Sequence, residues 1–248
     1  MYKIIFSATN RTEKCANIFC SIFDDIRKID LSYKNFKEVT LSKEDFCLIA
    51  VPVYGGRVPS PAIERIKKIK ANGAKAVLMV VYGNRSYDDA LAELEATCID
   101  TGFQIVSACT VPSQHSLMPQ IAENRPDNAD AERIKKFAYL SKEKAYNGQT
   151  LSTKVPGDIP NGYPHSLPVH PKVTKNCTKC GNCATRCPTG AIPLDNPTIT
   201  NKNLCITCMR CVEICPRNAR ILIPGIIKIT SPIMKKLWGK HTEIEFYY

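Results

Sequence analysis

Two copies of the pattern C-x2-C-x2-C-x3-C-P lie in the C-terminal third of the sequence. The first copy runs from Cys177 to Pro188 and the second from Cys205 to Pro216. Two-residue gaps let three thiolates of one tight loop point at a single cluster, whereas the fourth is set back and reaches the neighbouring cluster. The spacing therefore predicts two 4Fe-4S clusters, each of which passes one electron at a time.

This interleaving assigns every cysteine of the repeat to one cluster. The expected ligand sets are Cys177, Cys180, Cys183 and Cys215 for cluster 1, and Cys205, Cys208, Cys211 and Cys187 for cluster 2. Zinc is the alternative, because C-x2-C pairs also form sites of four thiolates around that metal. Four cysteines per unit, present twice and each time followed by proline, favour clusters over zinc.

The other five cysteines follow apolar helix or strand patterns, where cysteine behaves as a small hydrophobe. They are Cys15, Cys20, Cys47, Cys98 and Cys109. Free thiols together with clusters fit a reducing compartment, so we expect a cytoplasmic protein of an anaerobic or low-oxygen cell. The first residues lack the apolar core of a signal peptide, and no apolar run approaches the ~18 residues of a transmembrane helix.

Residues 1–148 alternate short apolar runs with segments of helical periodicity, as in a parallel sheet with helices on both faces. Strands are expected at residues 2–6, 36–41, 46–51, 75–81 and 103–111. Apolar residues from Cys15 to Ile29 recur at three- and four-residue steps, which predicts a helix between the first two strands. The predicted fold class is α/β, with a doubly wound sheet of five parallel strands.

The remainder of the chain divides into three segments by composition. Proline and glycine crowd residues 149–171 without hydrophobic periodicity, which predicts a linker. Residues 172–222 hold the cysteine repeat and are expected to form a small α+β domain with two clusters. Residues 223–248 are an apolar and basic tail, for which packing back on the domain is favoured over contact with a membrane surface.

Three loops at the carboxyl edge of the predicted sheet could bind a flat phosphorylated ligand. The loop after the first strand can surround a dianionic phosphate at a helix N-terminus through Ser7, Thr9, Asn10, Arg11 and Thr12. The next two loops contribute Pro52, Val53, Tyr54 and Gly55, then Tyr82, Gly83, Asn84, Tyr87 and Asp88. An aromatic residue followed by glycine can place a ring against each side of a heterocycle.

His115 follows the fifth strand and lies at the same sheet edge. Two roles are open for it, because an imidazole can donate a proton to a bound ligand or can anchor its own loop. Anchoring is the favoured role.

The phosphate loop resembles that of flavodoxins, which commonly reads Ser-Gly-Thr-Gly-Asn-Thr. Ala8 and Asn10 replace the glycines here, and Arg11 replaces asparagine. Asn10 tolerates a left-handed backbone, and Arg11 can pair with phosphate. The cysteine repeat is similar to that of bacterial two-cluster ferredoxins. The whole chain thus resembles the flavodoxin-ferredoxin fusion proteins of anaerobic bacteria and archaea, and this resemblance implies FMN in the first domain.

FMN and two clusters on one chain lead us to expect an electron-transfer protein, either a carrier or the electron-input module of a reductase. An FMN-dependent reductase that acts on a small acceptor is one alternative. A cluster-based redox sensor or binding protein is the other. The sequence has no dinucleotide-binding fingerprint, which disfavours direct oxidation of NAD(P)H.

The formal net charge of +11 bears on the choice of partner. The basic residues are spread over separate segments without a nucleic-acid-binding motif, so we expect no nucleic acid partner. Two clusters and an FMN phosphate would leave roughly +5 on the loaded chain. A positive carrier is steered toward acidic redox proteins, so the expected partner is an acidic ferredoxin-type protein or a reductase.

Overall fold

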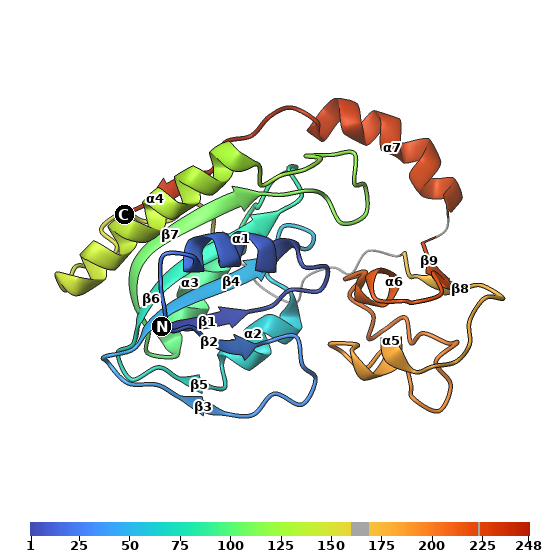
Figure 1. Cartoon of the computed structure of the whole chain (residues 1–248), viewed down its shortest axis with the longest axis horizontal. Coiled ribbons are helices and arrows are strands. Elements are labelled where there is room, and N and C mark those ends of the chain that lie inside the picture. The colour runs from blue at the N-terminus through green and yellow to red at the C-terminus, as the bar shows by residue number, and fades with distance from the viewer. Residues whose placement is uncertain (160–168, 223) are drawn as a thin grey trace.

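A six-stranded sheet with helices on both faces forms the larger part of the protein (Figure 1). The computed structural model describes residues 1–159, 169–222 and 224–248. The parallel strands of the sheet are β1 (Tyr2–Ile5), β2 (Arg27–Asp30), β4 (Phe46–Pro52), β6 (Lys75–Tyr82) and β7 (Gln104–Pro112). Their order is β2-β1-β4-β6-β7. This order is the flavodoxin-like one, so the predicted doubly wound α/β fold is confirmed.

The second parallel strand is not the predicted one. We expected it at residues 36–41, whereas the chain forms β2 at Arg27–Asp30. Helix α1 (Arg11–Cys20) consequently ends before the helical periodicity that we extended to Ile29. β2 is a short strand at the edge of the sheet, and its side chains are exposed or half-buried. It therefore lacks the continuous apolar run by which a buried strand is recognised.

The segment that we expected as the second strand contributes only β3 (Val39–Thr40). β3 pairs in parallel with β5 (Ile69–Lys70) in a separate two-stranded sheet. Leu41 is buried beside it, and its N–H donates to the Lys70 carbonyl oxygen at 2.9 Å. The apolar residues of this segment thus pack at the side of the core and add no strand to the main sheet.

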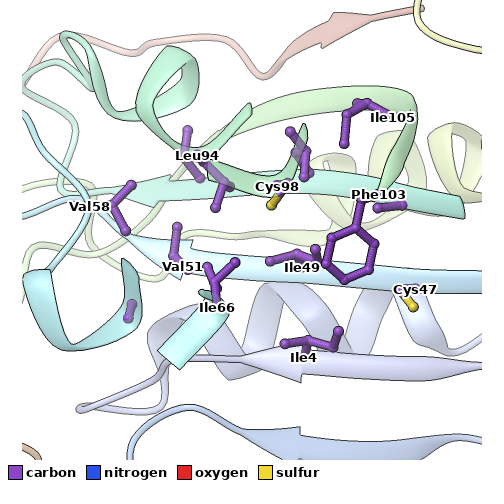
Figure 2. Close-up of a cluster of buried hydrophobic side chains, with 14 of the residues drawn as sticks. Ile4, Cys47, Ile49, Val51, Val58, Ile66, Leu94, Cys98, Phe103 and Ile105 are labelled. Atoms are coloured by element: carbon purple, nitrogen blue, oxygen red, sulfur yellow. The ribbon is translucent and has the colours of Figure 1, made fainter. Parts of the chain in front are cut away.

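Helices cover the two faces of the sheet in pairs. The pairs are α1 with α4 (Asn128–Tyr146) on one face, and α2 (Ser60–Ile66) with α3 (Ala90–Asp100) on the other. Figure 2 shows the second layer, where Ile49 of β4 lies near Leu94 and Cys98 of α3. The first layer joins Phe19 of α1 to Phe137 of α4, with ring centroids 6.0 Å apart. The sheet is therefore buried on both faces, as a parallel sheet requires.

The cysteines outside the repeat lie in these two layers, as predicted. Each has an exposed fraction of 2% or less, and they are Cys15, Cys20, Cys47, Cys98 and Cys109. Burial raises the pKa of the thiol to about 12 for Cys15 and Cys47 and to about 11 for Cys20. These thiols stay protonated at neutral pH and act as packing residues.

The end of the chain returns to the sheet. β10 (Glu245–Tyr247) adds an antiparallel strand beside β7, where Phe246 stacks on Phe137 with ring centroids 4.9 Å apart. Helix α7 (Pro224–Trp238) leads from the smaller part of the molecule toward this strand (Figure 1). The tail thus packs on the sheet at its end. Within the described residues, no helix has the length and apolar character needed to cross a membrane.

Residues 169–222 form a small domain beside the sheet, at the right of Figure 1. Its elements are β8 (Lys172–Val173), α5 (Asn182–Thr185), α6 (Arg210–Glu213) and β9 (Arg220–Ile221). β8 and β9 pair in antiparallel fashion, so the predicted α+β character is confirmed. The buried Arg220 guanidinium donates to Thr200 Oγ1 at 2.7 Å and to the Pro197 carbonyl oxygen at 2.5 Å. These bonds connect the segment that contains Pro197 and Thr200 to β9.

The predicted linker at 149–171 is described only in part, because residues 160–168 lie outside the described residues. Its first residues pack on the sheet. Leu151 donates its N–H to the Ile105 carbonyl oxygen at 2.7 Å, and Val155 has an exposed fraction of 1%. These residues are structurally part of the body built on the large sheet, which we call the sheet domain.

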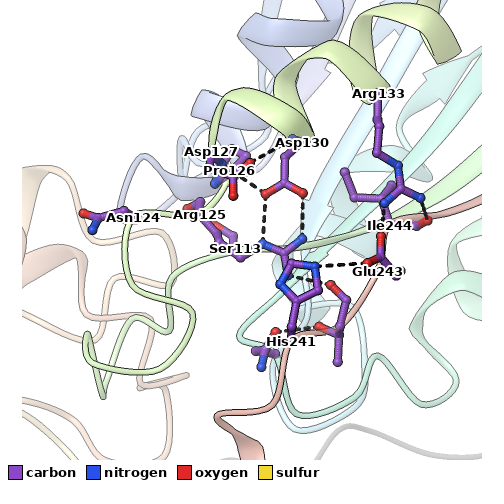
Figure 3. Close-up of polar contacts among 12 residues, drawn as sticks. Ser113, Asn124, Arg125, Pro126, Asp127, Asp130, Arg133, His241, Glu243 and Ile244 are labelled. Carbon is purple, nitrogen blue, oxygen red and sulfur yellow. Dashed lines mark hydrogen bonds and ion pairs between the residues drawn. The ribbon is translucent and has the colours of Figure 1, made fainter.

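A buried ion pair joins the loop after β7, the start of α4 and the C-terminal tail (Figure 3). Arg125 donates to both carboxylate oxygens of Asp130, at 2.8 and 2.6 Å, and to the Thr242 carbonyl oxygen at 2.5 Å. Asp130 also forms a capping box with Asp127 at the start of α4. Burial alone would raise the pKa of Asp130. The hydrogen bonds and charge of Arg125, together with the hydrogen bond to the Asp127 backbone, outweigh burial, so the pKa lies below its usual value.

We predict that Asp130→Ala destabilises the sheet domain by about 3 kcal/mol, because it leaves the Arg125 charge buried without its partner. Urea denaturation at neutral pH measures the effect. Glu132→Ala, on the same helical turn, removes an exposed ion pair with Lys135 and should cost under about 0.5 kcal/mol. Equal losses for the two variants would show that the buried pair has no special role.

Candidate functional site

The carboxyl ends of the central strands open onto one pocket with about 1030 Å³ of empty space. It lies where the strand order reverses between β1 and β4, the position at which open α/β sheets bind ligands. The residues singled out in the sequence that line it are Thr9, Arg11, Thr12, Pro52, Val53, Tyr54, Gly55, Tyr82, Gly83 and His115. All three predicted loops and the loop after β7 therefore contribute to one cavity.

The loop after β1 forms one end of this pocket. Asn10 precedes α1 in the left-handed region at φ 59°, a conformation that asparagine tolerates. Arg11 lines the pocket, and its Nη1 donates to the Thr9 carbonyl oxygen at 2.8 Å. Its buried Nε atom has no hydrogen-bond partner within the part of the chain that the structure describes. Arg11 thus lines the pocket at the α1 N-terminus with a buried N–H that has no partner among the described residues, and this combination suits an anion.

Two tyrosines line the pocket on neighbouring loops. Burial raises the pKa of Tyr54 well above its ordinary value, and burial also raises the pKa of Tyr82. Both side chains are therefore neutral phenols that offer ring faces to a ligand. Gly83 follows the second tyrosine, and a Cβ atom at this position would lie 2.4 Å from the His115 ring. Glycine is thus required for the close approach of these two loops.

His115 anchors its own loop. Its Nδ1 atom accepts hydrogen bonds from the N–H groups of Leu117 and Met118, at 3.1 and 3.2 Å. Burial lowers the pKa of His115 to about 4, so the ring is neutral at pH 7 and carries its proton on Nε2. The ring also stacks on Trp238 of α7 with centroids 6.3 Å apart. These contacts are those of the anchoring role that the sequence favoured.

Five residues of the predicted loops lie outside the pocket lining. They are Ser7, Asn10, Asn84, Tyr87 and Asp88. Asn84 donates to the carbonyl oxygens of Trp238 and Lys240, at 2.5 and 2.8 Å, and Tyr87 donates to the Glu245 carboxylate at 2.6 Å. Ser7 Oγ accepts the N–H of Glu13 at 3.2 Å, and Asp88 pairs with Arg85. Several of these side chains therefore hold the tail or the loops themselves.

Other lining residues were not predicted as part of this pocket. They are Ala8, Pro59, Ser60, Val81, Ser113, Gln114, Ser116, Leu117, Ile206, Thr207 and Cys208. The polar run around His115 was a signal for three of them, Ser113, Gln114 and Ser116, since it follows a strand at the same edge. The last three come from the small domain, and nothing in the sequence places that segment beside the sheet.

Each predicted set of four cysteines lines its own cavity in the small domain. Cys177, Cys180, Cys183 and Cys215 surround one cavity of about 350 Å³ of empty space. Cys187, Cys205, Cys208 and Cys211 surround another of about 360 Å³. None of the described cysteines forms a disulfide.

The small domain contacts the sheet domain through two arginines. Arg210 donates to the Ser7 carbonyl oxygen at 2.6 Å and to the Ala8 carbonyl oxygen at 3.4 Å. In the opposite direction, the buried Arg65 of α2 donates to the Pro188 carbonyl oxygen at 2.5 Å. Cys208 of the small domain lines both the large pocket and the second cysteine cavity. The cavity of Cys208 is therefore next to the pocket in the sheet domain.

Comparison with known proteins supports the composition of the small domain. Residues 176–220 match the family model of the 4Fe-4S dicluster domain. No curated protein matches the chain. A flavodoxin-like sheet joined to a 4Fe-4S dicluster domain is the combination predicted from the sequence, and it fits an electron-transfer role.

The chain is also similar to solved structures over part of its length. A flavodoxin of Streptococcus pneumoniae TIGR4 is 18% identical, with a TM-score of 0.42, over 58% of this chain and 98% of its own. The flavodoxin of Fusobacterium nucleatum bound to flavin mononucleotide is 14% identical, with a TM-score of 0.41, over 58% of this chain and 97% of its own. The rubredoxin:oxygen oxidoreductase of Desulfovibrio gigas is 15% identical, with a TM-score of 0.42, over 58% of this chain and 36% of its own.

Proposed function

We propose that this protein relays electrons between FMN in the large pocket and two 4Fe-4S clusters in the small domain. The position of Cys208 is the observation that carries the proposal. Cys208 lines both the pocket and the cavity that it shares with three other cysteines of the repeat. A ligand of one cluster would therefore form part of the wall around the flavin, which gives electrons a short route between the two cofactors.

The pocket has groups that suit FMN. A buried N–H without a partner is unfavourable, and a phosphate oxygen would satisfy the free Nε of Arg11 with a charge-assisted bond. The hydroxyls of Thr9 and Thr12 line the same end, at the start of α1. The neutral rings of Tyr54 and Tyr82 offer surfaces for a flat heterocycle. We assign the phosphate to the α1 end and the flavin ring to the tyrosines.

The two cysteine cavities suit cubane clusters because each offers four thiols around one space. We assign cluster 1 to Cys177, Cys180, Cys183 and Cys215, and cluster 2 to Cys205, Cys208, Cys211 and Cys187. Backbone N–H groups already point at sulfur, from Lys179 to Cys177 at 3.4 Å and from Ala219 to Cys215 at 3.2 Å. Such hydrogen bonds stabilise negative charge on cluster sulfur.

When bound, FMN exchanges one or two electrons and each cluster exchanges one, so the pair couples two-electron to one-electron chemistry. The chain positions these groups. Arg210 and Arg65 hold the small domain against the phosphate loop and α2, which keeps Cys208 at the pocket. His115 stabilises its own loop after β7, which also lines the pocket.

We also propose the cytoplasm of an anaerobic or low-oxygen cell as the setting, and an acidic redox protein as the partner. All thirteen cysteines of the chain are free thiols, which is in line with a reducing compartment. The formal net charge of +11 favours encounter with an acidic carrier.

The relay is tested by rapid electron injection into the loaded protein. After a light pulse that delivers one electron per chain, the absorbances of cluster and flavin should change together with a first-order rate that is independent of protein concentration. Arg210→Ala should slow this exchange, because it removes the contacts to Ser7 and Ala8. Arg186→Ala changes an exposed arginine of the same domain and is the control. A rate proportional to protein concentration would contradict the relay.

The ligand assignment predicts reciprocal damage in cysteine variants. Cys215→Ala should remove the cluster of Cys177, Cys180 and Cys183 and spare the other, because the fourth ligand comes from the opposite half of the repeat. Cys187→Ala should do the reverse. Iron and sulfide contents with electron paramagnetic resonance measure each cluster. Loss of the Cys205 cluster alone in Cys215→Ala would contradict the assignment.

Arg11→Ala should weaken FMN binding by ~10- to 100-fold, because a charge-assisted bond to the phosphate is lost. Riboflavin has no phosphate, so its dissociation constant should change by less than about threefold. Fluorescence titration of the flavin-free protein with both ligands measures the difference. Equal weakening of the two ligands would remove Arg11 from the phosphate site.

A further inference from the structure

The cluster of Cys187, Cys205, Cys208 and Cys211 has its side toward the sheet domain covered. Arg210 and Arg65 donate across the junction to Ser7 and Pro188, and Glu213 Oε2 lies 3.8 Å from Nη1 of Arg11 in the phosphate loop. Its cysteines are all partly buried. A protein partner therefore has poor access to this inner cluster.

The other cluster cavity faces outward. Cys180 is exposed, whereas the other seven cysteines of the repeat are partly buried. Leu194 has an exposed fraction of 66% and lies beside Gly181, the residue after Cys180, because a Cβ atom at Gly181 would be 3.9 Å from Leu194 Cδ2. An exposed leucine near an exposed cysteine adds an apolar contact to this surface, and apolar contacts of this kind are common in protein interfaces.

Basic residues line the outer cysteine cavity and the hollow next to it. Lys179 and Arg217 line the outer cavity together with its cysteines, and both are exposed. A neighbouring hollow, lined by Cys177, adds the exposed lysines Lys172, Lys175 and Lys202. Acidic residues are scarce in this domain, because residues 172–222 contain only Asp195 and Glu213. Glu213 lies at the junction with the sheet domain, so Asp195 is the one acid left to this surface.

We propose that this outer cluster face, defined by Cys180, Leu194, Lys175, Lys179 and Arg217, is the docking surface for a small acidic protein that carries one electron at a time. The inference rests on the proposed relay and names its external port. Electrons would enter or leave through the cluster of Cys177, Cys180, Cys183 and Cys215, and the inner cluster would connect it to the flavin. Lys175, Lys179 and Arg217, the basic rim of this face, select the partner by charge, and Leu194 packs against it.

Charge reversal tests the face. Lys175→Glu/Arg217→Glu, in the protein loaded with both clusters and FMN, is compared with Lys43→Glu/Lys136→Glu, which makes the same charge change at exposed lysines of the sheet domain. The partner is a purified acidic two-cluster ferredoxin. At low salt, the face variant should bind it about tenfold more weakly and exchange electrons about tenfold more slowly, with the control within about twofold of the unmodified protein. Both differences should shrink at high salt.

A small uncharged one-electron dye separates this proposal from the relay. All proteins should exchange electrons with the dye at similar rates, because the dye needs no basic rim. Equal effects of the two variants on ferredoxin binding, or ferredoxin binding that does not depend on salt, would overturn the outer cluster face as the docking surface. If the dye still reacts normally in that case, the relay is unaffected. A loaded protein that exchanges electrons with neither ferredoxin nor dye would overturn both.

Discussion

The arrangement of the whole molecule depends on arginine side chains that donate to main-chain carbonyl oxygens across the junction of the two domains. Arg210 reaches the phosphate loop at Ser7 and Ala8, and Arg65 reaches Pro188 from the other side. Buried carbonyl groups need donors, and a guanidinium supplies several in a fixed geometry. These bonds act together with Ile206 and Cys208, which pack against the hydrophobic core of the sheet domain, to hold Cys208 at the pocket.

The C-terminal tail adds a second constraint on the same pocket. It ends as β10 on the sheet edge, and on the way Asn84 bonds the Trp238 and Lys240 carbonyl oxygens. Arg125 binds the tail at Thr242 and the carboxylate of Asp130 at once. The loops after β6 and β7, which line the pocket, are therefore positioned by residues more than a hundred positions away in the sequence. The tail is thus part of the sheet domain in space.

Much of the fold could be predicted because its signals are local. Buried parallel strands are continuous apolar runs, so β1, β4, β6 and β7 were found near their observed bounds. β2 was missed because its side chains are exposed or half-buried, so it lacks a continuous apolar run. Its Ile29 also continued the helical periodicity of α1. β10 was missed because an antiparallel edge strand of three residues depends on the partner that it pairs with, β7, and not on its own pattern.

The cysteine repeat and the three loops determine by themselves which chemistry this chain can hold, because ligand spacing and turn residues are properties of short segments. The sequence also determines that the loops meet, since the carboxyl ends of parallel strands share one edge. Only the tertiary structure decides that Asn84 and Tyr87 bind the tail, and that Cys208 lines the pocket. It also decides that the Arg11 Nε has no hydrogen-bond partner among the described residues. Those facts follow from contacts between distant segments, and no local pattern encodes which buried donor finds which acceptor.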